Sequence, residues 1–166
     1  MDSVLRAVGH SLALQFLEGV RFLHEHKVAH LDLKDTNIVI TPTMQLQIID
    51  YDVSVLGVGP ESWIVGYRGT KGWAAPELEH DPDGKFQPIP ADLWSAGRVL
   101  ESIYSRIGDI FGFAVIMRRL LRDNPRERPY LSEVLQDTPL AKLKRDLLAD
   151  VATKEGDKRQ TCATHL

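Results

Sequence analysis

The sequence predicts a mainly α-helical domain with one short β-hairpin, and three stretches of the chain support this prediction. Apolar side chains recur at helical spacing over residues 5–23, which indicates a long amphipathic helix. Two β-branched runs, NIVI at 37–40 and LQIID at 46–50, flank a proline-containing insert, which favours a hairpin. The stretch LWSAGRVLESIYSRI at 93–107 has the composition of a buried helix, and Asp92 is expected to be its N-cap.

The remaining elements follow in chain order. A Gly-rich stretch at 52–72 and a Pro-rich stretch at 80–90 are expected to be loops. The apolar pattern from 111 to 121 predicts another helix, and residues 131–148 predict one or two more, interrupted at a proline. The last residues are polar, so the sequence predicts one folded lobe over 1–149 and a disordered tail over 150–166.

Composition and charge exclude several classes of protein. With 166 residues and 43% hydrophobic content, the chain fits one globular domain. A net charge of -3 and scattered basic residues argue against nucleic-acid or anionic-membrane binding. The single cysteine, Cys162, rules out an internal disulfide framework. No signal peptide or spanning apolar run is present, so a cytoplasmic or nuclear location is expected, whereas the oligomeric state is not predicted.

Four polar residues lie where the chemistry is expected. Asp32, Lys34 and Asn37 occupy the loop between the first helix and the hairpin, and Asp50 ends the second strand. A carboxylate to receive a hydroxyl proton, a Lys to hold a phosphoryl oxygen, and Asn and Asp oxygens for Mg²⁺ are the groups that phosphoryl transfer requires. Taken without its flanks, this short stretch is equally well interpreted as a solvated turn.

The flanking motifs resemble those of eukaryotic protein kinases of the serine/threonine type. The stretch HLDLKDTN is similar to the catalytic loop of that family, His-Arg-Asp-Leu-Lys-x-x-Asn. Four further matches follow in family order over roughly residues 10–140: IIDYD for the Asp-Phe-Gly motif, GTKGWAAPE for the end of the activation segment, ADLWSAGRVL for the central buried helix, and RDNPRERP for the late Arg-Pro element. The resemblance implies the C-terminal lobe of the α+β kinase fold, with a catalytic loop at 30–37 and an activation segment at 50–77.

The resemblance also implies roles for the catalytic and nucleotide-binding residues. Asp32 is expected to be the catalytic base, and Lys34 the contact to the transferred phosphoryl group. Asn37 and Asp50 are expected to hold Mg²⁺, and Val39 to form the floor under the adenine of ATP. ATP and Mg²⁺ are therefore the implied cofactors, and a protein substrate or partner protein is the implied partner.

Six further residues have structural roles in the resemblance. Tyr51 is expected to pack against His30, although ordinary core packing explains both Tyr51 and Val39 equally well. Thr70 together with the catalytic-loop Lys indicates serine/threonine specificity. Asp92 is expected to accept backbone N–H groups of the catalytic loop, and Glu77 to form a poorly exposed ion pair with Arg128.

The chain departs from the family pattern at several places. A Gly-rich phosphate loop, a strand Lys and its helix Glu, all from the smaller kinase lobe, are not found, so we expect the chain alone to bind Mg-ATP weakly. Asp52 replaces the Gly of Asp-Phe-Gly, and Leu31 replaces the Arg that pairs with an activation-loop phosphate. His24 and His26 end the first helix and are expected to lie on the surface, with no metal role.

Three functions therefore compete. The first is an ATP- and Mg²⁺-dependent serine/threonine protein kinase that depends on a second lobe. The second is a catalytically inactive, partner-binding pseudokinase lobe. The third is a small-molecule phosphotransferase, which the activation-segment motifs disfavour. Intact Asp32, Lys34, Asn37 and Asp50 favour the first function, whereas Asp52 favours lost activity.

Overall fold

The computed structural model describes residues 3–108 and 112–136 of the 166-residue chain. Contacts divide the chain into one compact unit spanning Met1–Val134 and a second spanning Leu135–Leu166. All the helices and strands named below belong to the first unit. The predicted tail at 150–166 and the predicted helical residues 137–148 lie outside the described part of the chain.

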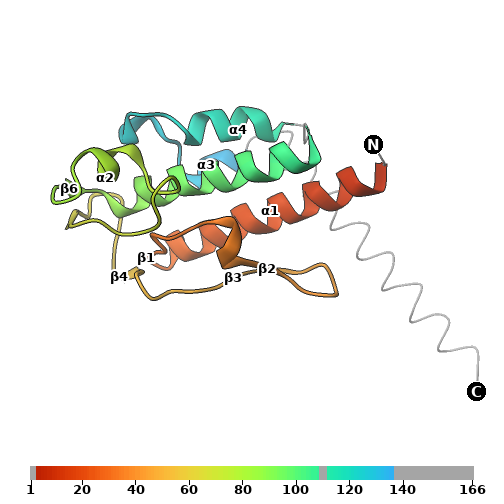
Figure 1. The fold of residues 1–166 in the computed structure, drawn as a ribbon, viewed down its shortest axis with the longest axis horizontal. Helices are drawn as coiled ribbons and strands as arrows, with labels where there is room; N and C mark the ends of the chain where they lie inside the picture. Colours follow the sequence, from red (N-terminus) through yellow and green to blue (C-terminus); the bar gives the residue numbers. More distant parts are fainter. Residues whose placement is uncertain (1–2, 109–111, 137–166) are drawn as a thin grey trace, which may run out of the picture. The chain divides into compact units, whose positions relative to one another are not determined.

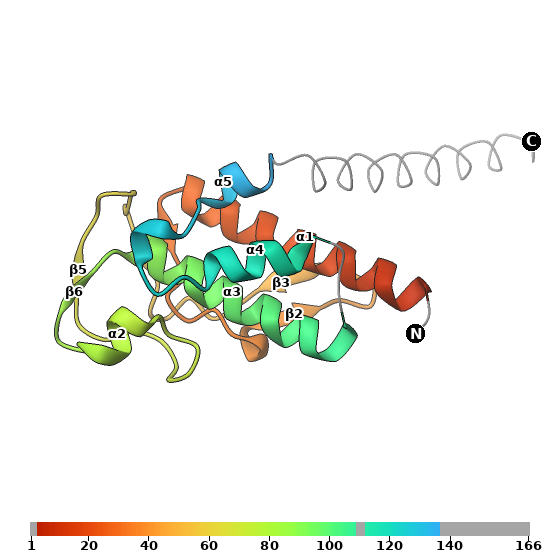
Figure 2. The same cartoon turned by 90° about the horizontal axis from the view of Figure 1, so that it is seen from above.

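Three helices form the body of this unit. The first, α1, runs over Ser3–Glu25, α3 over Pro88–Ile107 and α4 over Phe113–Leu120. Figure 1 shows α3 lying between α1 and α4, and α3 contacts both of them. Figure 2 shows the same three helices from above. The shorter helices are α2 at Pro76–His80 and α5 at Leu131–Val134, with 3₁₀ turns at Asp35–Asn37 (η1) and Pro125–Glu127 (η2).

The core lies along the faces of α1 and α3 that meet. Phe16, Leu17 and Val20 of α1 and Leu93 of α3 are fully buried. Gly97 allows α4 to approach α3 closely, because a Cβ at this position would lie 2.9 Å from Leu121 Cδ2. Burial of each such side chain contributes about 1.5–3 kcal/mol to stability. The packed helices therefore form a stable support for the loops.

The predicted hairpin is confirmed. Strands β2 (Ile38–Ile40) and β3 (Leu46–Ile48) are antiparallel, and Ile38 pairs with Ile48. The mainly α fold class with a short hairpin is therefore correct. In Figure 1 the hairpin lies alongside α1, on the side away from α4.

Two additional strand pairs were not predicted. Strand β1 (Val28–Ala29) pairs with β4 (Val55–Leu56), and β5 (Ile64–Val65) pairs with β6 (Lys85–Phe86), both antiparallel. Each strand has only two residues, too few for the period-2 pattern that identifies strands in a sequence. These pairs tie the loop predicted at 52–72 to the rest of the unit at two points, one near its start and one past its middle.

The predicted N-cap of α3 is wrong. The helix begins at Pro88 with Gln87 as its N-cap, so Asp92 lies inside the helix instead of before it. Proline is favoured in the first turn because its missing N–H would have no helical partner there, and this extends the helix upstream of Asp92. The helix predicted at 111–121 is confirmed as α4. None of the helices within residues 3–108 and 112–136 is long and apolar enough to cross a membrane.

Candidate active site

The predicted catalytic loop at 30–37 is anchored by the buried carboxylate of Asp92. The backbone N–H of His30 donates to its Oδ2 at 2.6 Å, and the N–H of Leu31 donates to its Oδ1 at 2.6 Å. Asp92 is fully buried, and α3 holds it in place. Leu31 has a φ of 64°, a strained conformation for a branched side chain. The two charge-assisted hydrogen bonds offset that strain and determine the direction in which the next residue leaves the turn.

His24 also contacts this carboxylate, which the sequence did not predict. Its Nε2 lies 3.1 Å from Asp92 Oδ2 and donates a hydrogen bond, because a carboxylate can only accept. The His24 side chain is only 10% exposed, so the predicted surface location is wrong. Its position near the end of α1 suggested solvation, but the helix turns this face toward α3. By contrast, His26 is exposed and contacts its own helix through Phe22 O.

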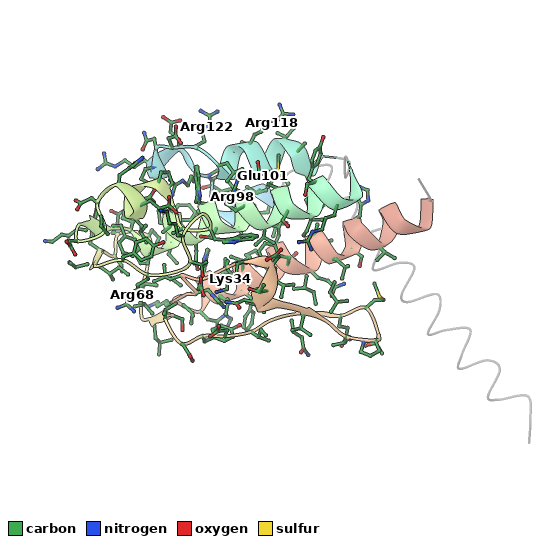
Figure 3. The ribbon with its side chains drawn as sticks, viewed as in Figure 1. Lys34, Arg68, Arg98, Glu101, Arg118 and Arg122 are labelled. Carbon is green, nitrogen blue, oxygen red and sulfur yellow. The ribbon has the colours of Figure 1, made fainter. Side chains whose placement is uncertain are left out.

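Asp32, Lys34 and Thr70 form a closed hydrogen-bonded cluster. Lys34 Nζ donates to Asp32 Oδ2 at 2.7 Å and to Thr70 Oγ1 at 2.8 Å, and Thr70 Oγ1 donates to Asp32 Oδ1 at 2.7 Å. Thr70 comes from a segment 36 residues further along the chain than Lys34. Figure 3 shows Lys34 where the catalytic loop passes between α3 and the hairpin. The cluster therefore joins the predicted catalytic loop to the predicted activation segment.

The Asp32 carboxyl stays ionised in this environment. Burial alone raises the pKa of Asp32, but hydrogen bonds from Lys34 and Thr70, the nearby Lys34 charge and a further hydrogen bond from Asn37 together lower it below its usual value. A carboxylate that is ionised at neutral pH can accept a hydrogen bond from a hydroxyl group. This is the state that a catalytic base requires before proton transfer.

Asn37 and Asp50 both lie at the open end of the hairpin. The Asn37 carbonyl accepts the backbone N–H of Ile49 at 3.0 Å, which places Asp50 one residue beyond that contact. The Asn37 Nδ2 group donates to Asp32 O at 3.0 Å and to Asp32 Oδ2 at 3.3 Å, so its Oδ1 points elsewhere. Asp50 is exposed with a φ of 67°, a left-handed conformation that Asp tolerates better than most residues. Both side chains offer hard oxygen atoms, which fit Mg²⁺.

Val39 and Tyr51 lie on the outer side of the hairpin region. Val39 is 41% exposed and Tyr51 is 43% exposed, so the alternative that they are ordinary core residues is wrong. The Tyr51 ring lies against His30, with centroids 4.8 Å apart and planes tilted by 54°. The His30 ring in turn contacts Ile49 O at 3.1 Å through Nε2. These contacts connect the anchored catalytic loop to the residue that follows Asp50.

The expected ion pair between Glu77 and Arg128 is present. Arg128 Nη1 and Nη2 donate to the two Glu77 carboxylate oxygens, each at 2.7 Å, in a bidentate arrangement. The Arg128 side chain is fully buried and also donates to Pro90 O at 2.9 Å. Its guanidinium carbon lies 5.1 Å from the Trp94 ring centroid, within cation–π range. This pair attaches the end of the predicted activation segment to the elements that follow α4.

A second, largely exposed ion pair joins the catalytic loop to α3, and sequence analysis did not predict it. Arg106 Nη2, near the end of α3, lies 2.6 Å from Asp35 Oδ2 in η1. The two residues are 71 positions apart, and neither belongs to a motif with a known charge partner. Only the packing of α3 beneath the catalytic loop brings them together.

Comparisons with known proteins agree with this geometry. The family model described as "Protein kinase domain" matches residues 3–108. The chain is 30% identical over 133 residues to the calcium/calmodulin-dependent protein kinase kinase of Caenorhabditis elegans, covering 77% of this chain and 25% of that protein. It is 38% identical over 89 residues to the probable serine/threonine-protein kinase KKQ8 of Candida glabrata, covering 51% of this chain and 12% of that protein.

A third relative is the serine/threonine-protein kinase 17A of Oryctolagus cuniculus, which is 36% identical over 105 residues, or 61% of this chain and 25% of that protein. The chain thus spans a quarter or less of the length of these three relatives. The family match extends through the catalytic loop, the hairpin, the activation segment and α3. The chain therefore belongs to the protein kinase family.

Proposed function

We propose that this chain provides the catalytic lobe of a serine/threonine protein kinase that uses Mg-ATP. The observation that carries the proposal is the cluster in which Asp32 accepts hydrogen bonds from both Lys34 and Thr70. Phosphoryl transfer depends mainly on positioning and charge neutralisation. A carboxylate held by two donors, one of which is the charged amino group of Lys34, supplies both functions at one point.

Each residue of the cluster has a defined task in the proposed reaction. The substrate hydroxyl attacks the γ-phosphorus of ATP, so an oxygen–phosphorus bond forms while the bond to the bridging oxygen breaks and ADP leaves. Asp32 accepts the hydroxyl proton. Lys34 contacts an oxygen of the transferred group, and Thr70 holds Asp32 in position through its 2.7 Å hydrogen bond. The lowered pKa of Asp32 keeps it ready to accept the proton only as the hydroxyl becomes acidic in the transition state.

The metal and the adenine have separate sites in this proposal. Asn37 Oδ1 and the Asp50 carboxylate would hold Mg²⁺, which when bound neutralises charge on the phosphates. The exposed side chain of Val39 would lie under the adenine. Its 41% exposure leaves apolar surface for a ligand to cover.

The nucleotide-positioning elements of the family are not among these 166 residues. Without a phosphate loop and its partner Lys, bound phosphates keep much of their freedom. Orientation supplies about 7–11 kcal/mol of the barrier reduction in well-positioned reactions, and losing part of it lowers turnover by orders of magnitude. We therefore expect the 166-residue chain by itself to bind Mg-ATP weakly and to show no transfer that depends on Asp32.

The first experiment measures the chain as it is. Calorimetric titration with Mg-ATP is expected to give weak binding at most, and radiolabel transfer to a basic protein is expected to stay at background. The comparison proteins are Asp32→Ala and Asp50→Ala. Micromolar binding that Asp50→Ala removes, or transfer that Asp32→Ala removes, would show that this lobe works alone.

The second experiment tests the catalytic proposal itself. The smaller kinase lobe of the Caenorhabditis elegans relative is fused before residue 3, and transfer to protein serine and threonine is measured. We expect transfer in the fusion and its loss in Asp32→Ala and Asp50→Ala, whereas Arg118→Ala on the far side of α4 leaves it unchanged. A folded fusion that binds Mg-ATP but transfers nothing would overturn the proposal.

A second candidate function has one observation in its favour. Among the large apolar side chains that the activation segment exposes, the three most exposed are Leu56 at 80%, Val65 at 58% and Trp63 at 53%. Such a surface fits a non-catalytic lobe that binds a partner protein. A folded, inactive fusion that binds Mg-ATP would favour this candidate. The small-molecule phosphotransferase has no comparable observation in its favour, since the relatives named above are protein kinases.

A further inference from the structure

The catalytic loop lacks the cation that its family uses toward the activation segment. Leu31 occupies the position before Asp32 where the motif has Arg, and it is only 4% exposed. An apolar side chain there cannot hold a phosphate or a carbonyl of the activation segment. The segment must therefore be held against the catalytic loop by another group, or it is not held at all.

Arg68 makes a contact of this kind from within the segment itself. Its Nη1 donates to the carbonyl oxygen of Val53 at 3.2 Å, across 15 positions of sequence. Val53 lies three residues after Asp50, whereas Arg68 lies two residues before Thr70. The hydrogen bond therefore joins the beginning of the activation segment to its catalytic end. Figure 3 shows Arg68 on the side of the molecule where β4 begins.

The two residues after Arg68 press directly on the catalytic loop. Gly69 has a φ of 99°, and a Cβ at this position would lie 2.5 Å from the carbonyl oxygen of Leu31. No other residue fits so close an approach in that backbone conformation. Thr70 follows at once and donates to Asp32 Oδ1 at 2.7 Å. Three consecutive residues thus bind, in order, the start of the segment, the loop backbone and the carboxylate.

We propose that Arg68 is a positioning residue that holds the activation segment in the conformation in which Thr70 reaches Asp32, in place of the missing catalytic-loop Arg. Arg68 acts through Gly69 and Thr70, since nothing in the structure places its guanidinium on Asp32. In naming Asp32 as the group to be positioned, the inference rests on the proposed function, but its geometry and its test do not require phosphoryl transfer.

The test measures Asp32 directly in the 166-residue chain. Aspartate carboxyl carbons are labelled with ¹³C, the Asp32 resonance is assigned by its loss in Asp32→Asn, and its pKa is followed by NMR titration. Hydrogen exchange of the amides over residues 53–70 is measured on the same proteins. Arg68→Ala is compared with Arg68→Lys, with Thr70→Val and with the matched control Arg118→Ala.

The expected results follow from the order of the contacts. Arg68→Ala releases Thr70, so the Asp32 pKa rises toward its usual value, as it does in Thr70→Val, and exchange over 53–70 accelerates at least tenfold. In Arg68→Lys we expect smaller changes of both the Asp32 pKa and the exchange rate over 53–70. In Arg118→Ala we expect neither quantity to change. The Asp32 pKa change in Arg68→Ala should persist in about 1 M salt, because salt does not screen the loss of a hydrogen bond. If the change came only from the lost distant charge of Arg68, salt would screen it.

Three outcomes would overturn the inference. The first is an Asp32 pKa that moves in Thr70→Val but not in Arg68→Ala. The second is a pKa change in Arg68→Ala that disappears in high salt, which would show a through-space charge effect only. The third is equal acceleration of exchange in α3, which would show that Arg68 stabilises the whole unit instead of positioning one segment. Failure of phosphoryl transfer in the fusion protein would leave all three measurements unaffected.

Discussion

The catalytic loop and the outer face of the hairpin differ sharply in how they are held. The loop is fixed from below by Asp92, a fully buried carboxylate with two backbone donors at 2.6 Å. The hairpin exposes Val39 at 41%, and the residues just after it include Ile49, exposed at 40%, and Tyr51, exposed at 43%. Contacts within this lobe therefore hold the residues proposed for the chemistry in place. The surface proposed for the adenine, by contrast, leaves its apolar side chains exposed to solvent. The proposed catalytic geometry and the proposed nucleotide binding can therefore be tested separately.

The largest expected effect concerns the anchor of the activation segment. Arg128→Ala leaves Glu77 without its bidentate partner and removes donors from the carbonyl groups of Pro90 and Asp123. Breaking a buried pair on one side typically costs about 3–5 kcal/mol, a large part of the stability of a domain this size. Urea unfolding measures the loss.

The exposed pair between Arg122 and Glu127 provides the control for this prediction, since its side chains are 56% and 49% exposed. Arg122→Ala is expected to cost about 0–1 kcal/mol. Equal effects of Arg128→Ala and Arg122→Ala would mean that burial of the Glu77 pair contributes nothing to the stability of the lobe.

The next effect is on the anchor of the catalytic loop. Asp92→Asn replaces one accepting oxygen by an amide group that cannot accept, so one of the two loop N–H groups loses its partner. Leaving a buried donor unsatisfied costs about 1–3 kcal/mol. We expect lower stability in urea and faster hydrogen exchange at His30 and Leu31. His24→Ala, which removes only the contact at 3.1 Å, should have a smaller effect on both amides. A larger effect of His24→Ala would contradict the assigned order of importance.

A pH effect distinguishes the catalytic cluster from its scaffold. Hydrogen bonds lower the pKa of folded Asp32 below the ordinary value of 3.8. Because the folded pKa is the lower one, the stability that these bonds contribute is fully present above about pH 3.8 and is lost as the pH falls through the lowered pKa. Compared with the parent, Asp32→Asn should therefore show a weaker loss of stability on acidification below that pH. Parallel curves in urea titrations at pH 2.5–5 would contradict this.

The smallest effect is expected on the exposed face of the hairpin. Val39→Thr removes little buried area, so the free energy of unfolding should change by about 0.5 kcal/mol or less. Leu93→Ala in the fully buried part of α3 is the matched comparison and should cost about 2–5 kcal/mol. Thermal unfolding measures both. A cost above about 1.5 kcal/mol for Val39→Thr would show that this face is part of the core after all.

Local patterns were sufficient to predict part of the fold, and they also suggested a candidate site. Hydrophobic periodicity and the positions of Gly and Pro predicted α1, α3, α4 and the β2–β3 hairpin, because each of these signals lies within one continuous stretch of sequence. The motif order also indicated which residue types carry the chemistry, since Asp32, Lys34 and Asn37 lie within six positions. The pairing of Glu77 with Arg128 followed only from the family resemblance, because 51 residues separate them.

Only the tertiary structure decided the contacts between residues that lie far apart in the sequence and that no motif links. The sequence placed Asp92 near a helix start and His24 near a helix end. Asp92 was wrongly expected to be an N-cap, although the family resemblance did imply its contact with the catalytic loop. His24 was wrongly expected to lie on the surface. The packing of α1 against α3 buries them together beneath the catalytic loop. In the same way, only folding brings Arg68 to Val53 and Arg106 to Asp35. The propensity of a side chain is a local property, whereas its hydrogen-bond partner depends on which distant residues folding brings near it. A buried polar group must find such a partner, so its environment is decided by the tertiary structure.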